Sequence, residues 1–108
     1  MISFSLIKFL SHPYARQETL EIVLRQDLYA IRKAINQYAS DQEKLPQSLN
    51  DLVSLGCIRE IPSDPVTTRQ DWEVELGQLK AIYGSDGIVY IHSSSSKMSI
   101  FGIPYHKF

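Results

Sequence analysis

The chain is poor in the residues that carry most redox and cofactor chemistry. Its single cysteine, Cys57, cannot form an internal disulfide and has no second cysteine at metal-ligand spacing. Phosphate-binding glycine loops, dinucleotide fingerprints and zinc motifs are absent from the sequence. Lys and Arg number 11 against 12 Asp and Glu, a formal net charge of −1, and no basic stripe interrupts that balance. We therefore expect no nucleic-acid partner.

Long hydrophobic runs are also missing. The apolar start, Met1–Leu10, is interrupted by Lys8, and a membrane-spanning helix needs about 20 apolar residues. This start also lacks the basic region and small-residue cleavage site of a secretory signal. We interpret residues 1–14 as a short apolar remnant of an N-terminal segment. Residues 15–108 are expected to form one globular domain, because 44% of the sequence is hydrophobic and 21% is charged.

A long amphipathic helix is predicted from about Ala15 to Ser40. Apolar residues recur there in steps of three and four, which is the period of a helix. They are Leu20, Leu24, Leu28, Ile31, Ile35 and Tyr38. The opposite face carries Arg16, Glu18, Arg25, Arg32 and Lys33 and is expected to be solvated. At 1.5 Å per residue this helix would be about 35–40 Å long.

The rest of the chain predicts a second helix and a small sheet. "LPQSLNDLVSLGCI" reads as a short helix, with Ser48 as N-cap, Asp51 three residues later and Gly56 at its end. After a proline-rich crossover, "WEVEL" alternates as a half-buried strand does, and "KAIYG" is a possible pairing partner. "GIVYIHS" is the strongest strand signal, and the run Ser93–Ser96 suggests a flexible loop. The predicted class is α+β, with a C-terminal antiparallel sheet.

This order of elements resembles the pilin-like family, specifically the pseudopilins of type II secretion and type IV pilus assembly. Four stretches carry the resemblance: "VLRQDLYAIRKAINQY", "LPQSLNDLV", "IREIPSDPVT…DW" and "GIVYIHSSSS…GIPYHKF". Together they cover Val23–Phe108. "FSLIKFL" echoes the family's N-terminal start, but Ser3 stands where the leader glycine would be and Lys8 where the glutamate would be. We interpret this start as trimmed or degenerate.

The resemblance implies a non-enzymatic structural subunit that supports protein secretion or fibre assembly. Its partners would be other pilin-like subunits and assembly proteins, with secreted cargo as a further contact. Its compartment would be the bacterial periplasm or inner membrane. The alternative is a soluble binding module that kept the fold and lost the membrane anchor. In a filament subunit, exposed apolar residues near the start of the helix would mark the contact with other subunits. These residues are Leu20, Val23 and Leu24.

Related major pseudopilins bind calcium in a C-terminal loop, so a calcium site was considered. Calcium prefers six to eight oxygen ligands with carboxylates prominent among them. The matching place in this chain offers Ser93–Ser96 and Lys97, without an acid. We therefore expect no bound calcium and no other cofactor.

Catalytic interpretations have little support. His12, His92 and His106 share no ligand spacing, and Ser93 beside His92 lacks the G-x-S-x-G context of a hydrolase serine. No catalytic residue is predicted, and Cys57 is expected to be a small buried filler.

The crossover "IPSDPVT" has two interpretations. Asp64 could be a ligand or a base; alternatively Pro62 and Pro65 stiffen the loop while Asp64 forms an Asx turn and Trp72 anchors the sheet. We favour this structural clasp, for which Asp64→Ala would cost about 1 kcal/mol of stability.

Overall fold

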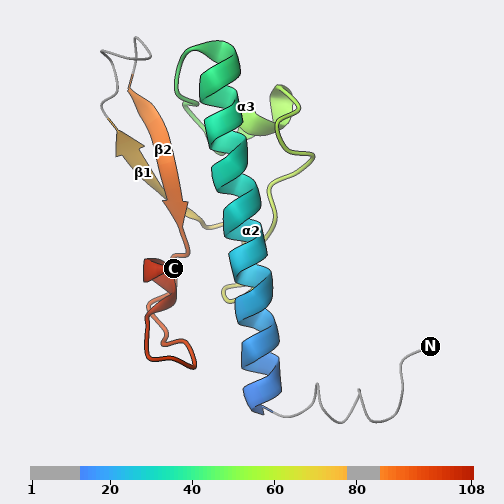
Figure 1. The fold of residues 1–108 in the computed structure, drawn as a ribbon, viewed down its shortest axis with the longest axis vertical. Coiled ribbons are helices and arrows are strands. Elements are labelled where there is room, and N and C mark those ends of the chain that lie inside the picture. Colours follow the sequence, from blue (N-terminus) through green and yellow to red (C-terminus); the bar gives the residue numbers. More distant parts are fainter. Residues whose placement is uncertain (1–12, 78–85) are drawn as a thin grey trace, which may run out of the picture.

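The structure is a computed structural model that describes residues 13–77 and 86–108. Its elements follow in the order α2 (Pro13–Gln42), α3 (Leu49–Ser54), β1 (Glu73–Gly77), β2 (Gly87–His92) and the 3-10 helix η1 (Tyr105–Lys107). One long helix stands beside a two-stranded antiparallel sheet (Figure 1). The predicted α+β class is confirmed. The strand considered at "KAIYG" and residues 1–12 of the predicted remnant lie outside the described residues.

Helix α2 is slightly longer than predicted. It begins at Pro13, which suits the first turn because that position needs no N–H, and it has 30 residues. That corresponds to about 45 Å. Its predicted apolar stripe is buried along one side from Leu24 to Tyr38. Within the described residues, no helix combines the length and the apolar character that a membrane span requires.

Helix α3 is delimited by the residues that the sequence pointed to. The Asp51 carboxylate accepts hydrogen bonds from the backbone N–H groups of Gln47 (2.8 Å) and Ser48 (3.3 Å) at its start. At its end Gly56 has φ +74°, the left-handed conformation that glycine adopts without strain. Cys57 then donates its N–H to the Leu52 carbonyl at 2.9 Å. The predicted limits are confirmed.

The two strands differ in burial. Their pairing runs from Glu73 opposite His92 to Gly77 opposite Gly87, with an irregularity between Glu75 and Leu76. Helix α2 packs against β2, while β1 lies on the outer side of the sheet (Figure 1). The expectation that β1 is half-buried is therefore wrong. Leu76 is 70% exposed and Val74 is also exposed, because none of the described helices covers the outer strand.

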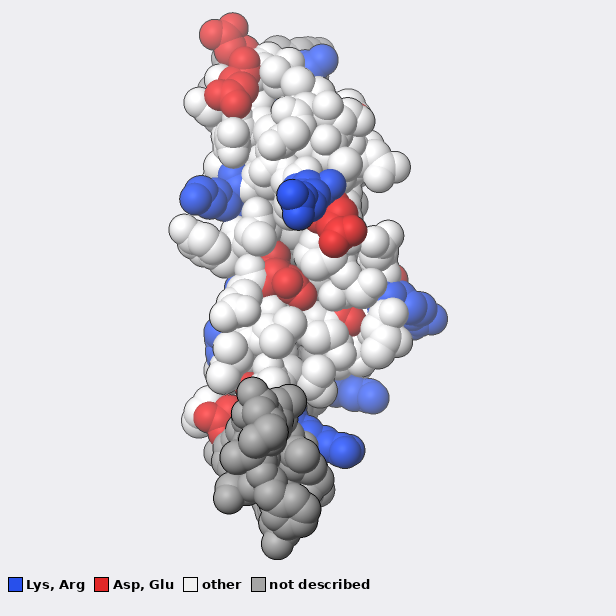
Figure 2. Space-filling view, turned by 90° about the vertical axis from the view of Figure 1, so that its right-hand side faces the viewer, with Lys and Arg blue, Asp and Glu red and all other residues white. Residues whose placement is uncertain are grey.

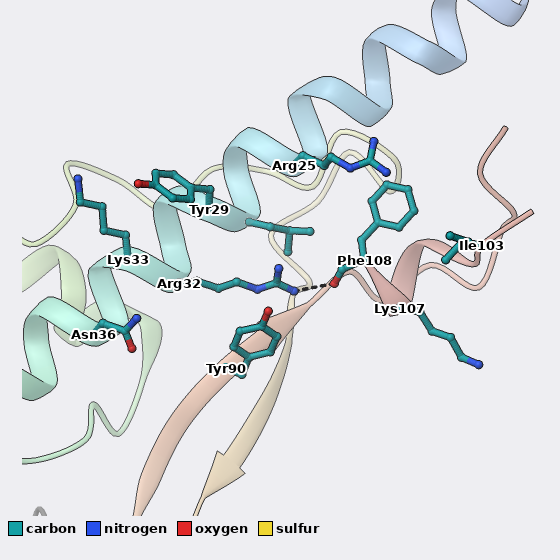
Figure 3. A pocket seen from close by; sticks show the side chains of 10 residues that line it. Arg25, Tyr29, Arg32, Lys33, Asn36, Tyr90, Ile103, Lys107 and Phe108 are labelled. Carbon is teal, nitrogen blue, oxygen red and sulfur yellow. Dashed lines mark hydrogen bonds between the residues drawn. The ribbon is translucent and has the colours of Figure 1, made fainter. Parts of the chain in front are cut away.

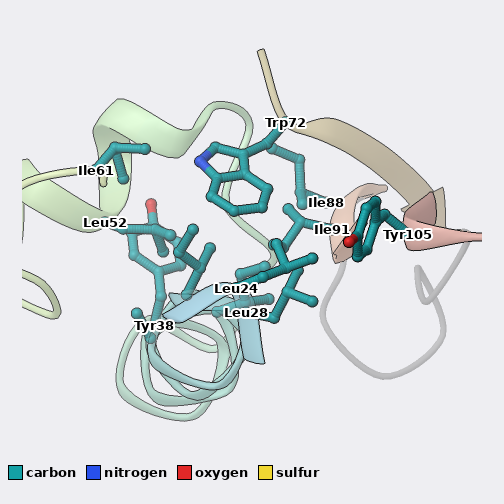
Figure 4. Close-up of a cluster of buried hydrophobic side chains, with 12 residues drawn as sticks. Leu24, Leu28, Tyr38, Leu52, Ile61, Trp72, Ile88, Ile91 and Tyr105 are labelled. Atoms are coloured by element: carbon teal, nitrogen blue, oxygen red, sulfur yellow. The ribbon is translucent and has the colours of Figure 1, made fainter. Parts of the chain in front are cut away.

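The hydrophobic core lies between α2, α3, the crossover, β2 and η1. Trp72 enters it from the end of the crossover, opposite the leucines of α2, with Ile88 and Ile91 from β2 beside it (Figure 4). The remaining members are Leu24, Leu28, Ile31, Ala34, Ile35, Tyr38, Leu52, Ile61 and Tyr105. The predicted stripe of α2 thus supplies about half of a single core.

Candidate functional site

The first candidate surface is the apolar group predicted on α2. Leu20 and Val23 are 38% and 37% exposed, so both are available to a partner. Leu24 is fully buried in the core and cannot belong to this surface. Leu20 lies on the same helical face as Leu24, one turn earlier. The difference comes from tertiary packing, which buries Leu24 in the core and leaves Leu20 and Val23 more than a third exposed.

The same end of α2 is not free on all sides. Past the strands, the C-terminal segment runs alongside the first turns of the helix (Figure 1). Buried Glu21 accepts hydrogen bonds from the Ile100 N–H at 2.7 Å and the Tyr105 hydroxyl at 3.2 Å. Gln17 donates to the Met98 carbonyl and to the same hydroxyl. Sequence reasoning missed Glu21, because a glutamate in an amphipathic helix is normally solvated.

The crossover contains the residues predicted as a clasp. Asp64 is fully buried. Its carboxylate accepts the Val66 N–H at 2.8 Å, which is the expected Asx-turn bond, and the Ser93 hydroxyl at 2.6 Å. The second bond was not foreseen. It connects the crossover directly to the residue that follows β2.

The other clasp residues extend this connection. Trp72 donates its Nε1–H to the Pro62 carbonyl at 2.7 Å, which closes the crossover on itself. Pro65 lies between Asp64 and the amide that Asp64 binds, where its ring restricts the turn. Asp71 accepts the hydroxyls of Thr67 (2.6 Å) and Ser94 (3.0 Å).

The serine run is built into the fold. Ser93 and Ser95 are buried, and the hydroxyl of each accepts the N–H of the residue two positions on. The interpretation of this run as a flexible loop is therefore wrong: its hydroxyls bind the crossover and the local backbone. Across 13–77 and 86–108, no three His, Cys, Asp or Glu side chains gather as metal ligands would. That the chain binds no calcium stays a prediction.

His92 and Ser93, the pair weighed for catalysis, make contacts within the fold, whereas His12 lies outside the described residues. His92 Nε2 lies 3.0 Å from Glu75 across the sheet, and its ring meets Tyr90 edge-on. Ser93, its neighbour, is buried and donates its hydroxyl to Asp64. Cys57 is half-buried, and burial followed by the nearby charge of Asp41 raises the pKa of its thiol. A raised pKa disfavours the reactive thiolate.

The structure has a second candidate surface, which the sequence did not predict. A groove of about 790 Å³ runs between α2 and the C-terminal part of the chain (Figure 3). Its basic residues are Arg25, Arg32, Lys33 and Lys107; its other lining residues are Leu28, Tyr29, Asn36, Tyr90, Ile103 and Phe108. No Asp or Glu side chain is among these lining residues. We call this the basic aromatic groove.

Arg32 holds the groove together. Its Nη2 donates to the main-chain oxygens of Phe108 at 2.7 Å and Ile91 at 3.0 Å, and its guanidinium lies 3.9 Å from the Tyr90 ring centre. Arg25 covers the Phe108 ring at 4.3 Å. The prediction that this helical face is simply solvated is wrong for Arg32. The spacing 25, 29, 32 and 36 does place these side chains on one helical face, but the residues opposite them come from 54 or more positions away.

Charge is mixed on the one face of the molecule that Figure 2 shows. On the face shown in Figure 2, basic and acidic side chains are interspersed among uncharged ones, without a continuous basic stripe on that face. The basic aromatic groove is therefore a local feature of a nearly neutral chain, whose net charge is −1.

Comparison of the chain with protein-family models, with curated proteins and with solved structures found no match. The fold class thus rests on the structure itself.

Proposed function

We propose that this chain is a non-enzymatic structural subunit of a pilin-like filament, of the type II secretion or type IV pilus kind. The proposal combines the sequence resemblance with one structural observation. A helix of 30 residues is packed on one side only, and near its start Leu20 and Val23 remain exposed at the edge of the buried stripe. The resemblance implies that subunits of such filaments stack through their N-terminal helices.

Under this proposal the chain performs no chemistry. Its partners are other pilin-like subunits and assembly proteins, with secreted cargo as a further contact, and its compartment is the bacterial periplasm or inner membrane. The buried position of Ser93 and the cross-strand contact of His92 with Glu75 agree with a non-catalytic role.

Self-association of the purified chain tests the proposal. Sedimentation velocity up to about 1 mM protein should show weak, concentration-dependent association. The double substitution Leu20→Glu and Val23→Glu should abolish it, because two carboxylates would have to be desolvated in the contact. Leu55→Glu is the control, since Leu55 is an exposed apolar residue (50% exposed) that lies just after α3. A chain that stays monomeric throughout, or an equal effect of Leu55→Glu, would refute the subunit proposal.

The second candidate is a soluble pilin-fold binding module. The basic aromatic groove favours it, because concave sites lined by aromatic side chains and a few polar groups are typical of ligand binding. A monomeric chain that binds a ligand in this groove would support the module over the filament subunit.

A further inference from the structure

We infer that the basic aromatic groove binds a small organic anion that carries a flat apolar group, such as an aromatic carboxylate, sulfonate or phosphate. This inference does not depend on the filament proposal, because it concerns the face of α2 that carries Arg25, Tyr29 and Arg32 rather than the edge with Leu20 and Val23.

The charge of the groove is the first argument. It gathers four of the chain's 11 Lys and Arg residues with no acidic side chain among its lining residues. The ion pairs within the described residues are those of Arg69 with Asp71 and His92 with Glu75. Arg25, Lys33 and Lys107 therefore have no carboxylate partner in that part of the chain. Like charges gathered without counter-charges repel one another, and an anion in the groove would relieve that repulsion.

The flat surfaces of the groove are the second argument. Tyr29 is strongly exposed, and Tyr90 and Phe108 lie against the guanidinium groups of Arg32 and Arg25. Figure 3 shows Arg32 beside the Tyr90 ring and Arg25 beside the Phe108 ring. Lys33 and Lys107 extend in opposite directions. A guanidinium plane and an aromatic ring both stack well on flat apolar groups. The same walls therefore suit the aromatic part of a ligand and its charge.

The groove is also organised in advance. Arg32 is held by Ile91 and Phe108, and the Phe108 ring is held edge-on by buried Tyr105 at 5.3 Å. Nη2 and Nε of Arg32 are engaged, whereas its Nη1 makes no hydrogen bond within the described residues. Side chains fixed before binding lose little entropy when a ligand arrives. The volume of the basic aromatic groove, about 790 Å³, lies within the roughly 300–1,000 Å³ typical of small-molecule sites.

A polymeric anion fits these observations less well. Nucleic acid is held by many phosphate contacts along an extended basic surface. Here the basic residues converge on one concavity, and the face in Figure 2 carries mixed charge. A compact anion is therefore the occupant that the geometry favours.

Two fluorescent probes that share one aromatic body test the inference. They are 1-anilinonaphthalene-8-sulfonate and its uncharged counterpart N-phenyl-1-naphthylamine, titrated into the folded chain. The anionic probe should bind at one site per chain and at least about tenfold more tightly than the neutral probe. Added salt should weaken the binding of the anionic probe only. Amide and arginine Nε resonances of Arg25, Arg32 and Tyr90 should shift on binding.

Charge-removing variants place the site. The double substitution Arg25→Gln and Lys33→Gln should lower the affinity for the anionic probe about fivefold or more. Lys107→Gln should also lower this affinity. Arg59→Gln is the matched control, because Arg59 is an exposed arginine outside the groove. Circular dichroism checks that each variant stays folded.

Three outcomes would overturn the inference. Equal affinity for both probes would show that only apolar surface is involved. An equal loss in Arg59→Gln would show that general charge is responsible. One probe per two chains, with dimerisation, would show that the groove is a contact between copies of this chain.

Discussion

The Ser93 hydroxyl donates a 2.6 Å hydrogen bond to the Asp64 carboxylate across 29 positions of sequence, and both residues are completely buried. The bond joins the middle of the crossover to the end of β2. Asp64 also stabilises its own turn by accepting the Val66 N–H. One carboxylate therefore holds the turn of the crossover and connects it to the residue that follows β2. This makes Asp64 a structural centre of the domain.

Substitution of Asp64 should therefore cost more than an isolated Asx turn would. Asp64→Ala leaves the Ser93 hydroxyl and the Val66 amide without their partner, and we expect it to lower the free energy of unfolding by about 2–3 kcal/mol. Ser93→Ala should cost about 1–2 kcal/mol, because Val66 keeps its acceptor. Urea denaturation of both single variants and the double variant measures the coupling. Additive losses would contradict a direct Asp64–Ser93 interaction.

Glu21 should contribute to stability in a way that its exposed neighbour does not. Glu21→Ala leaves the Ile100 amide and the Tyr105 hydroxyl without an acceptor, and we expect a loss of about 2 kcal/mol. Glu21→Gln keeps an acceptor oxygen and should lose less. Glu18→Ala, on an exposed position of the same helix, should change stability by less than about 0.5 kcal/mol. Faster hydrogen exchange of the Ile100 amide in Glu21→Ala alone would locate the effect; unchanged exchange would argue against it.

Asp71 should make stability depend on pH in the acid range. The hydroxyl of Thr67, and less strongly that of Ser94, lowers the pKa of Asp71 from its ordinary value of 3.8, although burial opposes this. A carboxyl group whose pKa is lower in the folded state stabilises the fold above its unfolded pKa, and this contribution is lost as pH falls through the folded value. At pH 7 the Asp71→Asn variant should therefore have a lower melting temperature than the natural chain. The difference should shrink as pH falls below 3.8. Melting curves in a pH series measure it, and a constant difference would contradict the assignment.

Leu24 and Leu20 should respond differently to truncation although they lie one helical turn apart. Leu24→Ala opens a cavity in the core and should cost about 3 kcal/mol or more. Leu20→Ala removes a partly exposed side chain and should cost about 0.5 kcal/mol or less in the monomer. Chemical denaturation at low protein concentration provides both values. A large loss for Leu20→Ala would mean that Leu20 supports the fold and is unavailable as a contact surface.

Features that depend on neighbouring residues could be predicted from the sequence. Helical spacing predicted α2 and its buried side, Asp51 and Gly56 marked the limits of α3, and the β-branched run predicted β2. Each of these signals acts over a few positions, through backbone geometry or through the period of the element. The Asx turn of Asp64 belongs to the same group.

Which polar side chains are buried, and what they bind, depends on the tertiary structure. Glu21 meets Tyr105 across 84 positions, and Arg32 meets Phe108 across 76. A glutamate or arginine on an amphipathic helix has the same local pattern whether water or a distant segment covers it. The burial of Leu24 beside exposed Leu20, the engaged serine run and the basic aromatic groove depend in the same way on segments that fold back onto α2. Such contacts have no local sequence period, so they become visible only once the chain is folded.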